Sequence, residues 1–355
     1  MLKMNVTGIN TSKSCLFFEV NSDRDPSFFT MNIVVAVLNV IFGFIAVFAN
    51  TLIMYVIWKN PFLHSPSNTL LCCLSLADFL VGLLAQPAFV IHKIGEILDD
   101  FDIYCATRVI AEFVGVLTAS VSILTLAAIS VERLLAIRLH LRYKELVTTL
   151  RVLKLVALIW VFVILLLIAR LVIANEKVFF SFSLPLVLAS LLVTIVAYIF
   201  IFRVVLRHQS VIEAHSATPA NHQTHNGRRQ TLAFNFLKYK KSTLTMCYIL
   251  GIFLLCYLPM VVVVLLRGIV QYSLAMKIAY FTSTTIVNLN SSINPVVYCW
   301  RVTNIRCAVK RTLSKMVGER WQGEFELTDF GNATKRPQGV GNNRDGQLAT
   351  QTTSQ

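Results

Sequence analysis

The chain has 355 residues, of which 56% are hydrophobic and only 14% are charged, and its formal net charge at pH 7 is +14. A water-soluble domain with so little charge would aggregate, so the composition indicates a membrane protein with several spans. The basic residues lie in short segments between long apolar stretches, which argues against nucleic-acid binding as the reason for the basic charge.

Seven apolar stretches follow one another along the chain, and each is long enough to cross a bilayer as a helix. We expect them at about residues 28–58, 67–92, 104–137, 152–174, 179–207, 240–266 and 275–300. Pro259 and Pro295 should bend the sixth and seventh spans. Basic and apolar residues alternate over 301–317, which predicts an amphipathic helix lying on the inner membrane surface. The predicted fold class is therefore all-α membrane, a seven-transmembrane helix bundle with a short amphipathic eighth helix.

The predicted organisation has four parts. Residues 1–27 form an extracellular glycosylated N-terminus, 28–300 the seven-transmembrane domain, 301–317 the amphipathic helix and 318–355 a disordered cytoplasmic tail. In this topology, 23 of the 32 Lys and Arg residues lie in cytoplasmic segments and 9 lie elsewhere. This asymmetry is the positive-inside signal that sets the orientation of membrane proteins.

Three features belong to the expected outer surface. Asn5 and Asn10 begin Asn-X-Ser/Thr sequons, which fits a glycosylated leader outside the cell. Cys15 and Cys105 are the only cysteines in outer segments, so a bridge between them and two free thiols are the open alternatives. A short acidic loop should follow the second span; its carboxylates are Glu96, Asp99, Asp100 and Asp102.

The third span carries a polar face, on which acidic, small, hydroxyl and basic residues recur at spacings of three and four. These residues include Glu112, Gly115, Ala119, Ser122 and Arg133. A helix that faces lipid needs no such stripe, so we expect the other spans to pack around this one.

Asp78 is the deepest charge within the predicted spans. A charge at the middle of a span raises the free energy of membrane insertion by roughly 2.5–3.5 kcal/mol, which marks this residue as a functional candidate. Hydroxyl and amide oxygens at similar depth come from Ser122, Asn290, Ser291 and Asn294. Such a set suits a small hard cation or a water cluster, and a buried polar network with no ligand is the alternative.

Six motifs occur in order, one per span. They are Asn50, Leu74-Ser75-Leu76-Ala77-Asp78, Glu132-Arg133-Leu134, Trp160, Cys256-Tyr257-Leu258-Pro259 and Asn294-Pro295-Val296-Val297-Tyr298. Together with Tyr198 on the fifth span, they resemble the fingerprints of rhodopsin-like (class A) G-protein-coupled receptors over about residues 28–313. A short second outer loop without Cys resembles the melanocortin, lysophospholipid and cannabinoid branch. The spacing from Tyr298 to Ile305 is similar to that of melanocortin and adenosine receptors.

The resemblance implies roles for individual residues. An allosteric sodium ion, with no other cofactor, would be held by Asp78, Ser122, Asn290, Ser291 and Asn294. Arg133 would face the G protein in the active state and be held by Glu132 in the inactive state. The full set for G-protein coupling and the activation switch is Glu132, Arg133, Leu141, Tyr198, Phe253, Tyr257, Pro259, Pro295 and Tyr298. Ile305 would anchor the eighth helix.

The chain also departs from the family pattern. The departures are Leu134 for Tyr, Tyr257 for Trp, Ser190 for Pro on the fifth span, Arg108 for Cys on the third, and Tyr239 for the acidic residue that latches Arg133 from the sixth. Because one restraint on the inactive state is missing, we predict measurable signalling without ligand.

The resemblance also implies a ligand pocket. Its predicted residues are His92, Arg108, Glu112, Gly115, Val116, Ala119, Phe182, Met260, Val264, Arg267, Tyr280, Thr284 and Asn288. Gly115 stands where amine receptors carry Asp, and Asn288 where opsins carry Lys, which argues against a biogenic amine and retinal. Glu112 would meet a basic peptide group or pair with Arg108 or Arg267. Apolar walls suit a lipid equally, and His92 is expected at the rim.

We therefore predict a multi-pass plasma-membrane receptor rather than an enzyme, with its N-terminus outside the cell. It would bind an extracellular ligand, most plausibly a peptide or a lipid with an adenosine-like purine as the alternative, and would activate heterotrimeric G proteins. Arrestin and a receptor kinase would act on the Ser and Thr residues of the tail, and membrane lipid but no nucleic acid would contact the chain. A transporter or channel is a distant alternative, since no internal repeat is apparent.

Overall fold

The computed structural model describes residues 14–15, 18–19, 26–139, 142–173, 185, 188–204, 248–249, 251–266 and 273–317. The chain divides into a large unit, Met1–Leu313, and a small unit, Ser314–Gln355, and the bundle belongs to the large unit. The described part is almost entirely helical. Its strands are the two-residue β1 (Ser14–Cys15) and β2 (Phe18–Glu19), which pair antiparallel.

The helices follow the predicted spans closely. Their bounds are α1 Pro26–Lys59, η1 Pro61–Leu63, α2 Pro66–Leu80, η2 Val81–Ala85, α3 Gln86–Leu98, α4 Phe101–Leu139, α5 Tyr143–Leu146, α6 Thr149–Ile173, α9 Leu274–Arg301 and α10 Thr303–Val317. Two shorter apolar helices, Leu188–Val204 and Gly251–Leu266, fall within the fifth and sixth predicted spans. Among the described residues, four segments are long and apolar enough to cross a membrane, namely Phe28–Lys59, Pro66–Leu98, Phe101–Leu139 and Thr149–Arg170. The 28 residues of α9 also suffice in length to span the bilayer core.

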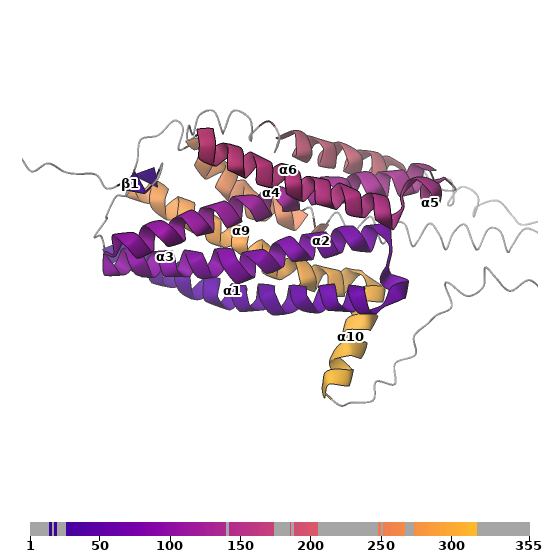
Figure 1. Cartoon of the computed structure of the whole chain (residues 1–355), viewed down its shortest axis with the longest axis horizontal. Helices are drawn as coiled ribbons and strands as arrows, with labels where there is room; N and C mark the ends of the chain where they lie inside the picture. The colour runs from indigo at the N-terminus through magenta and orange to yellow at the C-terminus, as the bar shows by residue number, and fades with distance from the viewer. Residues whose placement is uncertain are drawn as a thin grey trace, which may run out of the picture. The chain divides into compact units, whose positions relative to one another are not determined.

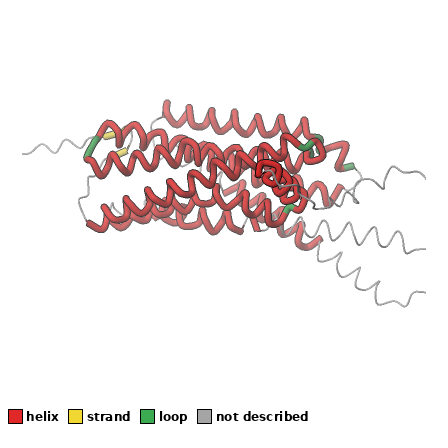
Figure 2. Tube along the Cα trace, turned by 90° about the horizontal axis from the view of Figure 1, so that it is seen from below, coloured by secondary structure: helices red, strands yellow, loops and turns green. Residues whose placement is uncertain are grey.

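The third predicted span, α4, lies inside the bundle. It packs against α2, η2 and α3 on one side and against α6 on another, whereas α1 packs against α2, α3 and α9. Figure 1 and Figure 2 show these long helices running alongside one another, with the short β hairpin at one end. The position of α4 is the one that its polar face predicts, because a polar stripe is satisfied by neighbouring helices and not by lipid.

The second span is not one regular helix. Ser65 caps α2 by accepting a hydrogen bond from the backbone N–H of Asn68 at 3.3 Å, and Pro66 occupies the first turn. The chain then forms the π-helical turn η2 before α3, in whose first turn Pro87 stands. A wide turn accommodates a proline that cannot donate a backbone hydrogen bond. The apolar pattern of the sequence did not predict this interruption, because it does not distinguish a π-helical turn from an α-helix.

A glycine allows α1 to approach the π-helical turn closely. A Cβ atom added at Gly82 would lie 2.9 Å from the Cβ of Ala46 and 2.9 Å from the carbonyl oxygen of Gly43. No larger side chain fits at that distance, so small residues bring the two backbones together, as they commonly do between membrane helices. The α1–η2 contact thereby fixes where the second half of this span, α3, begins.

The second span also ends later than the sequence predicts. Helix α3 continues to Leu98 and stops at Asp99, whose φ of 60° gives the left-handed conformation that Asp tolerates at a helix end. Glu96 therefore lies on the helix and not in the acidic loop where we expected it. Its side chain is occupied by two lysines, described below, and this pairing stabilises the last turn.

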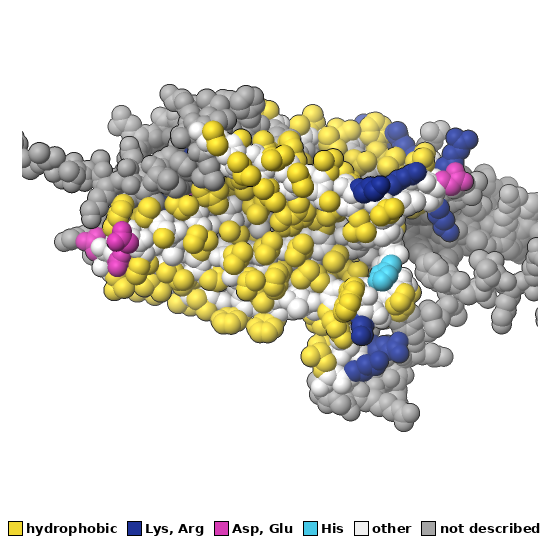
Figure 3. All heavy atoms as spheres, viewed as in Figure 1, with side chains coloured by type: hydrophobic (Ala, Val, Ile, Leu, Met, Phe, Trp, Pro, Cys, Tyr) yellow, Lys and Arg dark blue, Asp and Glu magenta, His cyan; other side chains and the backbone are white. Residues whose placement is uncertain are grey.

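Charges of opposite sign mark the two ends of the bundle. We call the end where α3 joins α4 the acidic end, because Asp99, Asp100 and Asp102 are exposed there. We call the other end, which carries α5, the basic end; its exposed residues include Arg138, Arg142, Lys144 and Arg151. Figure 3 shows hydrophobic side chains covering the helices between these ends. A hydrophobic belt between polar ends is the surface expected of a protein embedded in a bilayer.

The largest hydrophobic cluster lies toward the basic end. It joins residues of α1, α2, α4, α6, α9 and α10 with Ile249 and Phe253. Tyr298 and Ile305 are both 0% exposed within it. The predicted anchoring of the amphipathic helix through Ile305 is therefore confirmed, because this side chain is enclosed by the core of the bundle.

Candidate functional site

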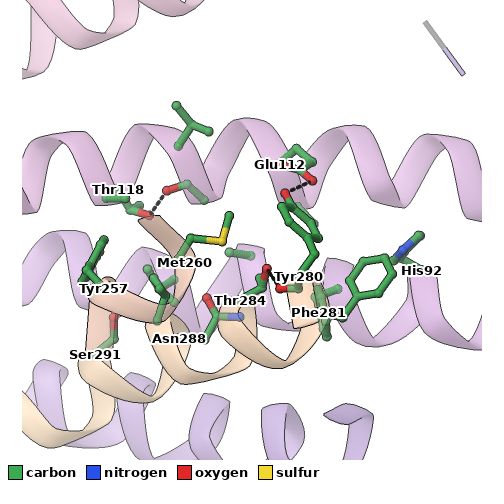
Figure 4. Close-up of a pocket in the computed structure, with 18 of the residues that line it drawn as sticks. His92, Glu112, Thr118, Tyr257, Met260, Tyr280, Phe281, Thr284, Asn288 and Ser291 are labelled. Carbon is green, nitrogen blue, oxygen red and sulfur yellow. Dashed lines mark hydrogen bonds between the residues drawn. The ribbon is translucent and has the colours of Figure 1, made fainter. Parts of the chain in front are cut away.

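A cavity of about 150 Å³ opens between α3, α4, α9 and the helix Gly251–Leu266. Its lining residues are Val81, Ala85, Phe89, His92, Arg108, Ala111, Glu112, Gly115, Val116, Thr118, Ala119, Ser122, Tyr257, Met260, Tyr280, Phe281, Thr284, Val287, Asn288 and Ser291. Figure 4 shows them lying along the cavity from His92 at one end to Tyr257 and Ser291 at the other. The ionisable side chains gather at the His92 end, and the wall between the two ends is largely apolar.

Most of the predicted pocket residues that the structure describes line this cavity. They are His92, Arg108, Glu112, Gly115, Val116, Ala119, Met260, Tyr280, Thr284 and Asn288. Val264 does not, because the helix Gly251–Leu266 presents Tyr257 and Met260 to the cavity and Val264 lies one turn further on. Phe182 and Arg267 lie outside the described residues. A Cβ atom added at Gly115 would meet nothing within 4 Å, so this position contributes open space.

Several lining residues were missed from the sequence. Ser122 was predicted on the polar face of α4 and in the cation site but was not included in the pocket. Thr118 lies one turn before Ser122, so the same periodicity could have identified it. Phe281 follows Tyr280 directly and could not have been chosen without its orientation. Val81 and Ala85 belong to the π-helical turn, whose altered geometry places them on the cavity side.

His92 is a buried residue and not the rim residue that we expected. Its side chain is 1% exposed, and its ring centroid lies 4.4 Å from that of Tyr104 and 5.7 Å from that of Phe281. Its Nδ1 atom lies 3.4 Å from the backbone carbonyl oxygen of Tyr104, and its Nε2 atom has no hydrogen-bond partner among the described residues. The aromatic side chains of α4 and α9 cover it because α3 extends one turn beyond the predicted span.

Glu112 is held by a tyrosine. The hydroxyl of Tyr280 on α9 donates to Oε1 of Glu112 on α4 at 2.6 Å. Arg108, one turn earlier on α4, donates instead to the hydroxyl of Tyr104. Among the described residues, the ion pairs of this structure do not include Arg108 with Glu112. Among these residues there is thus no direct Arg108–Glu112 salt bridge, Arg267 lies outside the described residues, and the role of Glu112 stays a prediction.

A second group of charges lies beside the cavity at the acidic end. The two carboxylate oxygens of Glu96 each lie 2.8 Å from a lysine, Oε2 from Lys93 and Oε1 from Lys277. The side chain of Lys93 is 0% exposed, and its ammonium lies 5.5 Å from the ring centroid of Phe28. We call Lys93, Glu96 and Lys277 the lysine clamp, because it joins α3 to α9. Charges of this kind are buried only when they are paired.

Helices α1 and α9 are joined by a polar contact that the sequence did not reveal. The Asn288 amide donates to Oδ1 of Asn39 at 2.8 Å, and the Asn39 amide lies 3.0 Å from the hydroxyl of Thr285. Further along, the Asn50 amide donates to the backbone carbonyl of Ser291 at 3.0 Å. Asn288 thus lines the cavity and binds α1 at once, so its amide orientation is fixed by a residue outside the pocket.

Two residues of the predicted cation site, Ser291 and Asn294, contact Asp78. This carboxylate is 1% exposed, the Asn294 amide donates to its Oδ2 atom at 2.8 Å, and the Ser291 hydroxyl lies within hydrogen-bonding reach. Ser122 and Ser291 line the adjoining end of the cavity. Within the described part of the chain, Asp78 takes part in no ion pair. On α2 and α9, the helices that carry Asp78 and Asn294, three buried oxygen atoms have no hydrogen-bond partner among the described residues. They are Ser75 Oγ, Asn290 Oδ1 and Tyr298 Oη.

Glu132 and Arg133 form the expected pair at the basic end, but the contact is loose. The closest atoms, Arg133 Nε and Glu132 Oε2, are 3.4 Å apart, and neither makes a hydrogen bond within the described residues. The other carboxylate oxygen of Glu132 accepts hydrogen bonds from Ser67 at 2.8 Å and from the hydroxyl of Tyr143. Burial, followed by the Glu132 carboxylate, raises the pKa of the Tyr143 phenol above its ordinary value. Ser67 and Tyr143 were not predicted, because neither belongs to a span motif.

The remaining switch residues lie between these two sites. Phe253 is 2% exposed and stacks on Tyr257 with ring centroids 4.0 Å apart. Tyr198 packs against the cluster that contains Phe253 and Tyr298. Pro295 is buried inside α9, and Pro259 lies within the helix Gly251–Leu266. Leu141 and the stretch around Tyr239 lie outside the described residues, as do the sequons at Asn5 and Asn10.

Cys105 is disulfide-bonded, so the alternative of two free outer thiols is wrong. The free cysteines of the described residues are Cys72, Cys73, Cys256, Cys299 and Cys307. Cys15 is not among them and lies on β1. Its pairing with Cys105 stays a prediction, which mass spectrometry of non-reduced peptides would decide.

Comparison with known proteins gives the family. The model of the 7 transmembrane receptor (rhodopsin family) matches residues 49–298. The adenosine receptor A2b of Rattus norvegicus is 28% identical over 331 residues, which cover 81% of this chain and 92% of that receptor. The adenosine receptor A2b of Bos taurus is 29% identical over 312 residues (77% and 87%), and the adenosine receptor A3 of Ovis aries is 24% identical over 294 residues (76% and 86%). The match begins just before Asn50 and ends at Tyr298, so it spans the motifs that first indicated this fold. The chain belongs to the rhodopsin-like, class A family of G-protein-coupled receptors.

Proposed function

We propose that this receptor binds an extracellular ligand in the cavity beside α4 and, when occupied, activates heterotrimeric G proteins at the basic end. The observation that carries the proposal is the arrangement along α4. Glu112 faces the cavity at one end of this helix, and Arg133 is held loosely by Glu132 at the other. One helix therefore connects a ligand-sized space to a cation that is poised for release.

The distribution of charge supports an orientation for the receptor. The acidic end would face outward with the N-terminus, and the basic end would face the cytoplasm, where positive residues accumulate in membrane proteins. Arrestin and a receptor kinase would then meet Thr350, Thr352, Thr353 and Ser354 on the cytoplasmic side. These tail residues lie outside the described part of the chain.

A peptide or a lipid is the ligand class that we favour. Glu112 faces the cavity with the neutral hydroxyl of Tyr280 as its hydrogen-bond partner, so its carboxylate would attract a basic group of a bound peptide. The apolar wall, which includes Val116, Ala119 and Met260, would cover either apolar peptide side chains or a lipid chain. In the lipid case, Arg108 at the same end would meet an anionic head group.

An adenosine-like purine is the alternative, favoured by the relatives that are named adenosine receptors. The cavity supports it in a limited way. Thr284 and Asn288 offer hydroxyl and amide groups, and Phe89 and Phe281 offer aromatic faces for a flat ring. This alternative predicts a response to adenosine itself, which separates it from the first proposal in a single assay.

Charge reversal of Glu112 would separate a peptide from a lipid. With Glu112→Lys, the response to a basic peptide should fall by at least about tenfold, because an attraction becomes a repulsion inside a partly desolvated cavity. The response to a lipid should change little. Asp102→Lys is the matched control, since Asp102 is an exposed carboxylate at the same end of the bundle.

The assay is expression in cells that carry a panel of G-protein activation sensors, screened with peptide, lipid and purine libraries. Arg133→Ala serves as the inactive reference, because it removes the cation expected to face the G protein. A ligand that activates the wild type and fails on this variant supports the receptor function. No activation by any ligand class, at confirmed surface expression, would contradict it.

We also propose that Asp78 holds an allosteric sodium ion. The residues present fit this ion, because within the described part of the chain the buried Asp78 carboxylate has no cationic partner and has the Ser291 hydroxyl and the Asn294 amide beside it. Oxygen atoms are the ligands that small hard cations prefer. Asp78, Ser122, Ser291, Asn290 and Asn294 are the residues that would hold the ion or its water molecules.

A further inference from the structure

Tyr257 adjoins both the ligand cavity and the buried carboxylate of Asp78. It lines the cavity together with Ser122 and Ser291, and Figure 4 shows it at the Ser291 end. Ser291, which lines the same end of the cavity, lies within hydrogen-bonding reach of the Asp78 carboxylate. The ring of Tyr257 is held by the stack on Phe253, with planes 18° apart, so the hydroxyl has a fixed direction.

The chemistry at this position differs between tyrosine and tryptophan, the residue that the family usually carries there. An indole N–H only donates a hydrogen bond and has no lone pair to offer a cation. A phenol donates and also accepts, so its oxygen can contact a cation or one of the cation's water molecules. The substitution therefore adds an oxygen atom at the end of the cavity that adjoins Asp78.

Polar atoms around Asp78 leave room for such a contribution. Ser75 Oγ and Asn290 Oδ1 are buried and have no hydrogen-bond partner among the described residues. Buried polar groups without partners cost free energy unless water or an ion satisfies them. Because Ser291 contacts Asp78 and lines the same end of the cavity as Tyr257, a hydrated cation held at Asp78 would lie beside Tyr257.

We propose that the Tyr257 hydroxyl is a further oxygen group of the cation site, which it contacts directly or through one water molecule. The inference rests on the proposed sodium site and adds a residue that this chain does not share with the usual pattern. Tyr257 also lines the ligand cavity, so ligand contact and cation binding act on the same side chain. By thermodynamic linkage, a ligand that displaces this hydroxyl weakens cation binding, and the cation weakens that ligand equally.

The test measures the thermal unfolding of the purified full-length receptor as NaCl replaces choline chloride at constant ionic strength. No ligand is needed, so the result is independent of G-protein activation. The wild type should become more stable with NaCl, and the concentration at half-effect reports the sodium affinity. Tyr257→Phe removes only the hydroxyl and should raise this concentration by about threefold to tenfold, the effect of one hydrogen bond.

Three further variants complete the test. Tyr257→Trp restores size and a donor but no acceptor, so its sodium affinity should be as weak as that of Tyr257→Phe. Tyr55→Phe is the matched control, because Tyr55 is 44% exposed on the outside of α1, and it should behave as the wild type. Asp78→Asn should abolish the dependence on NaCl. Both Tyr257 substitutions keep an aromatic ring against Phe253, which preserves the packing.

The outcomes are distinct. Wild-type sodium affinity in Tyr257→Phe, with no dependence in Asp78→Asn, overturns the role of Tyr257 and retains the sodium site. Wild-type affinity in Tyr257→Trp alone overturns the acceptor role of the phenol. A wild type that does not respond to NaCl overturns the sodium site and the role of Tyr257 together. The proposed receptor function stands or falls separately, in the G-protein activation assay.

Discussion

Glu96 at the acidic end and Glu132 at the basic end are both buried carboxylates that join separate parts of the chain, but their partners differ. Glu96 lies 2.8 Å from two lysine ammonium groups, Lys93 on its own helix and Lys277 on α9. Glu132 is 3.4 Å from Arg133 and takes its short contacts from the neutral hydroxyls of Ser67 and Tyr143. The first carboxylate is held by two charged partners, and the second by neutral hydroxyls that keep it hydrogen-bonded when Arg133 moves away.

This difference matches what the two ends would have to do. A lysine clamp between α3 and α9 resists separation of these helices, because parting them strands buried charges. At the basic end, Arg133 must be freed for a G protein to enter. A long ion pair without a hydrogen bond costs little to open, and the hydroxyls continue to satisfy the carboxylate. The comparison therefore predicts a rigid acidic end and a releasable basic end.

The largest effect should come from breaking the lysine clamp. Glu96→Gln leaves Lys93 and Lys277 without their shared carboxylate, and removing one partner of a buried ion pair typically costs about 3–5 kcal/mol. We expect a large loss of surface expression, measured by antibody staining of intact cells, and a lower unfolding temperature of whatever protein is recovered. Asp102→Asn, at an exposed carboxylate of the same end, should leave both unchanged. Normal expression and stability of Glu96→Gln would show that the clamp is not needed.

A smaller effect, on signalling and not on folding, should follow from Glu132→Gln. The substitution keeps the shape and an oxygen acceptor but removes the negative charge that attracts Arg133. Hydrogen bonds and close contacts to charged groups contribute about 1.5–3 kcal/mol, so ligand-independent G-protein activation should rise roughly tenfold or more. Arg133→Ala serves as the inactive reference, against which basal G-protein activation is measured in the same sensor assay. Basal activity equal to that of the wild type would mean that another contact restrains Arg133.

The smallest effect should come from Tyr143→Phe, which removes one hydrogen bond to the Glu132 carboxylate. The carboxylate keeps its negative charge and its hydrogen bond from Ser67, so basal activation should rise less than in Glu132→Gln, by about fivefold at most, which corresponds to about 1 kcal/mol. Because burial and Glu132 raise the pKa of the Tyr143 phenol, the hydroxyl keeps its proton well above neutral pH. The difference between variant and wild type should therefore be constant between about pH 6 and 8. A difference that disappears within this range would contradict the assigned hydrogen bond.

The same sensor assay measures basal signalling of the unmodified receptor. The sequence predicts measurable activity, because Tyr239 replaces an acidic latch on the sixth span. The loose contact between Glu132 and Arg133 supports the same expectation, because it restrains Arg133 only weakly. Wild-type activity indistinguishable from that of Arg133→Ala would make the prediction wrong.

The fold was predictable to a large extent, because a bilayer imposes a simple length and polarity pattern on each span. The packing of α4 against α2, α3 and α6 followed from its own polar face, and the burial of Asp78 followed from its place in an apolar span, whereas the roles proposed for Asp78 and Arg133 stay predictions. Most of the cavity lining was implied by the family resemblance, which places residues by their motifs and by their position along a span. The bounds of the helices and the polar face of α4 are the features that periodicity along a single helix is sufficient to predict.

The missed features depend on contacts between elements. Glu96 was placed in a loop because the apolar pattern ends before it, although two lysines allow α3 to continue past it. Tyr143 binds Glu132 through a fold of the chain between α4 and α6 that no span motif describes. Asn39 joins Asn288 across two helices that are far apart in sequence. The Tyr143–Glu132 and Asn39–Asn288 pairings cannot be predicted from one helix alone, because each depends on how two elements are rotated relative to each other.

The π-helical turn Val81–Ala85 has a consequence for how such a pocket could diversify. An additional residue in a helix rotates everything beyond it by about 100° while leaving everything before it in place. Asp78 precedes the turn, whereas His92 and Lys93 follow it. Losing or gaining one residue here would change which α3 side chains face the cavity and would leave Asp78 and the first half of the span in place. A single codon would then reshape one wall of the cavity without moving Asp78.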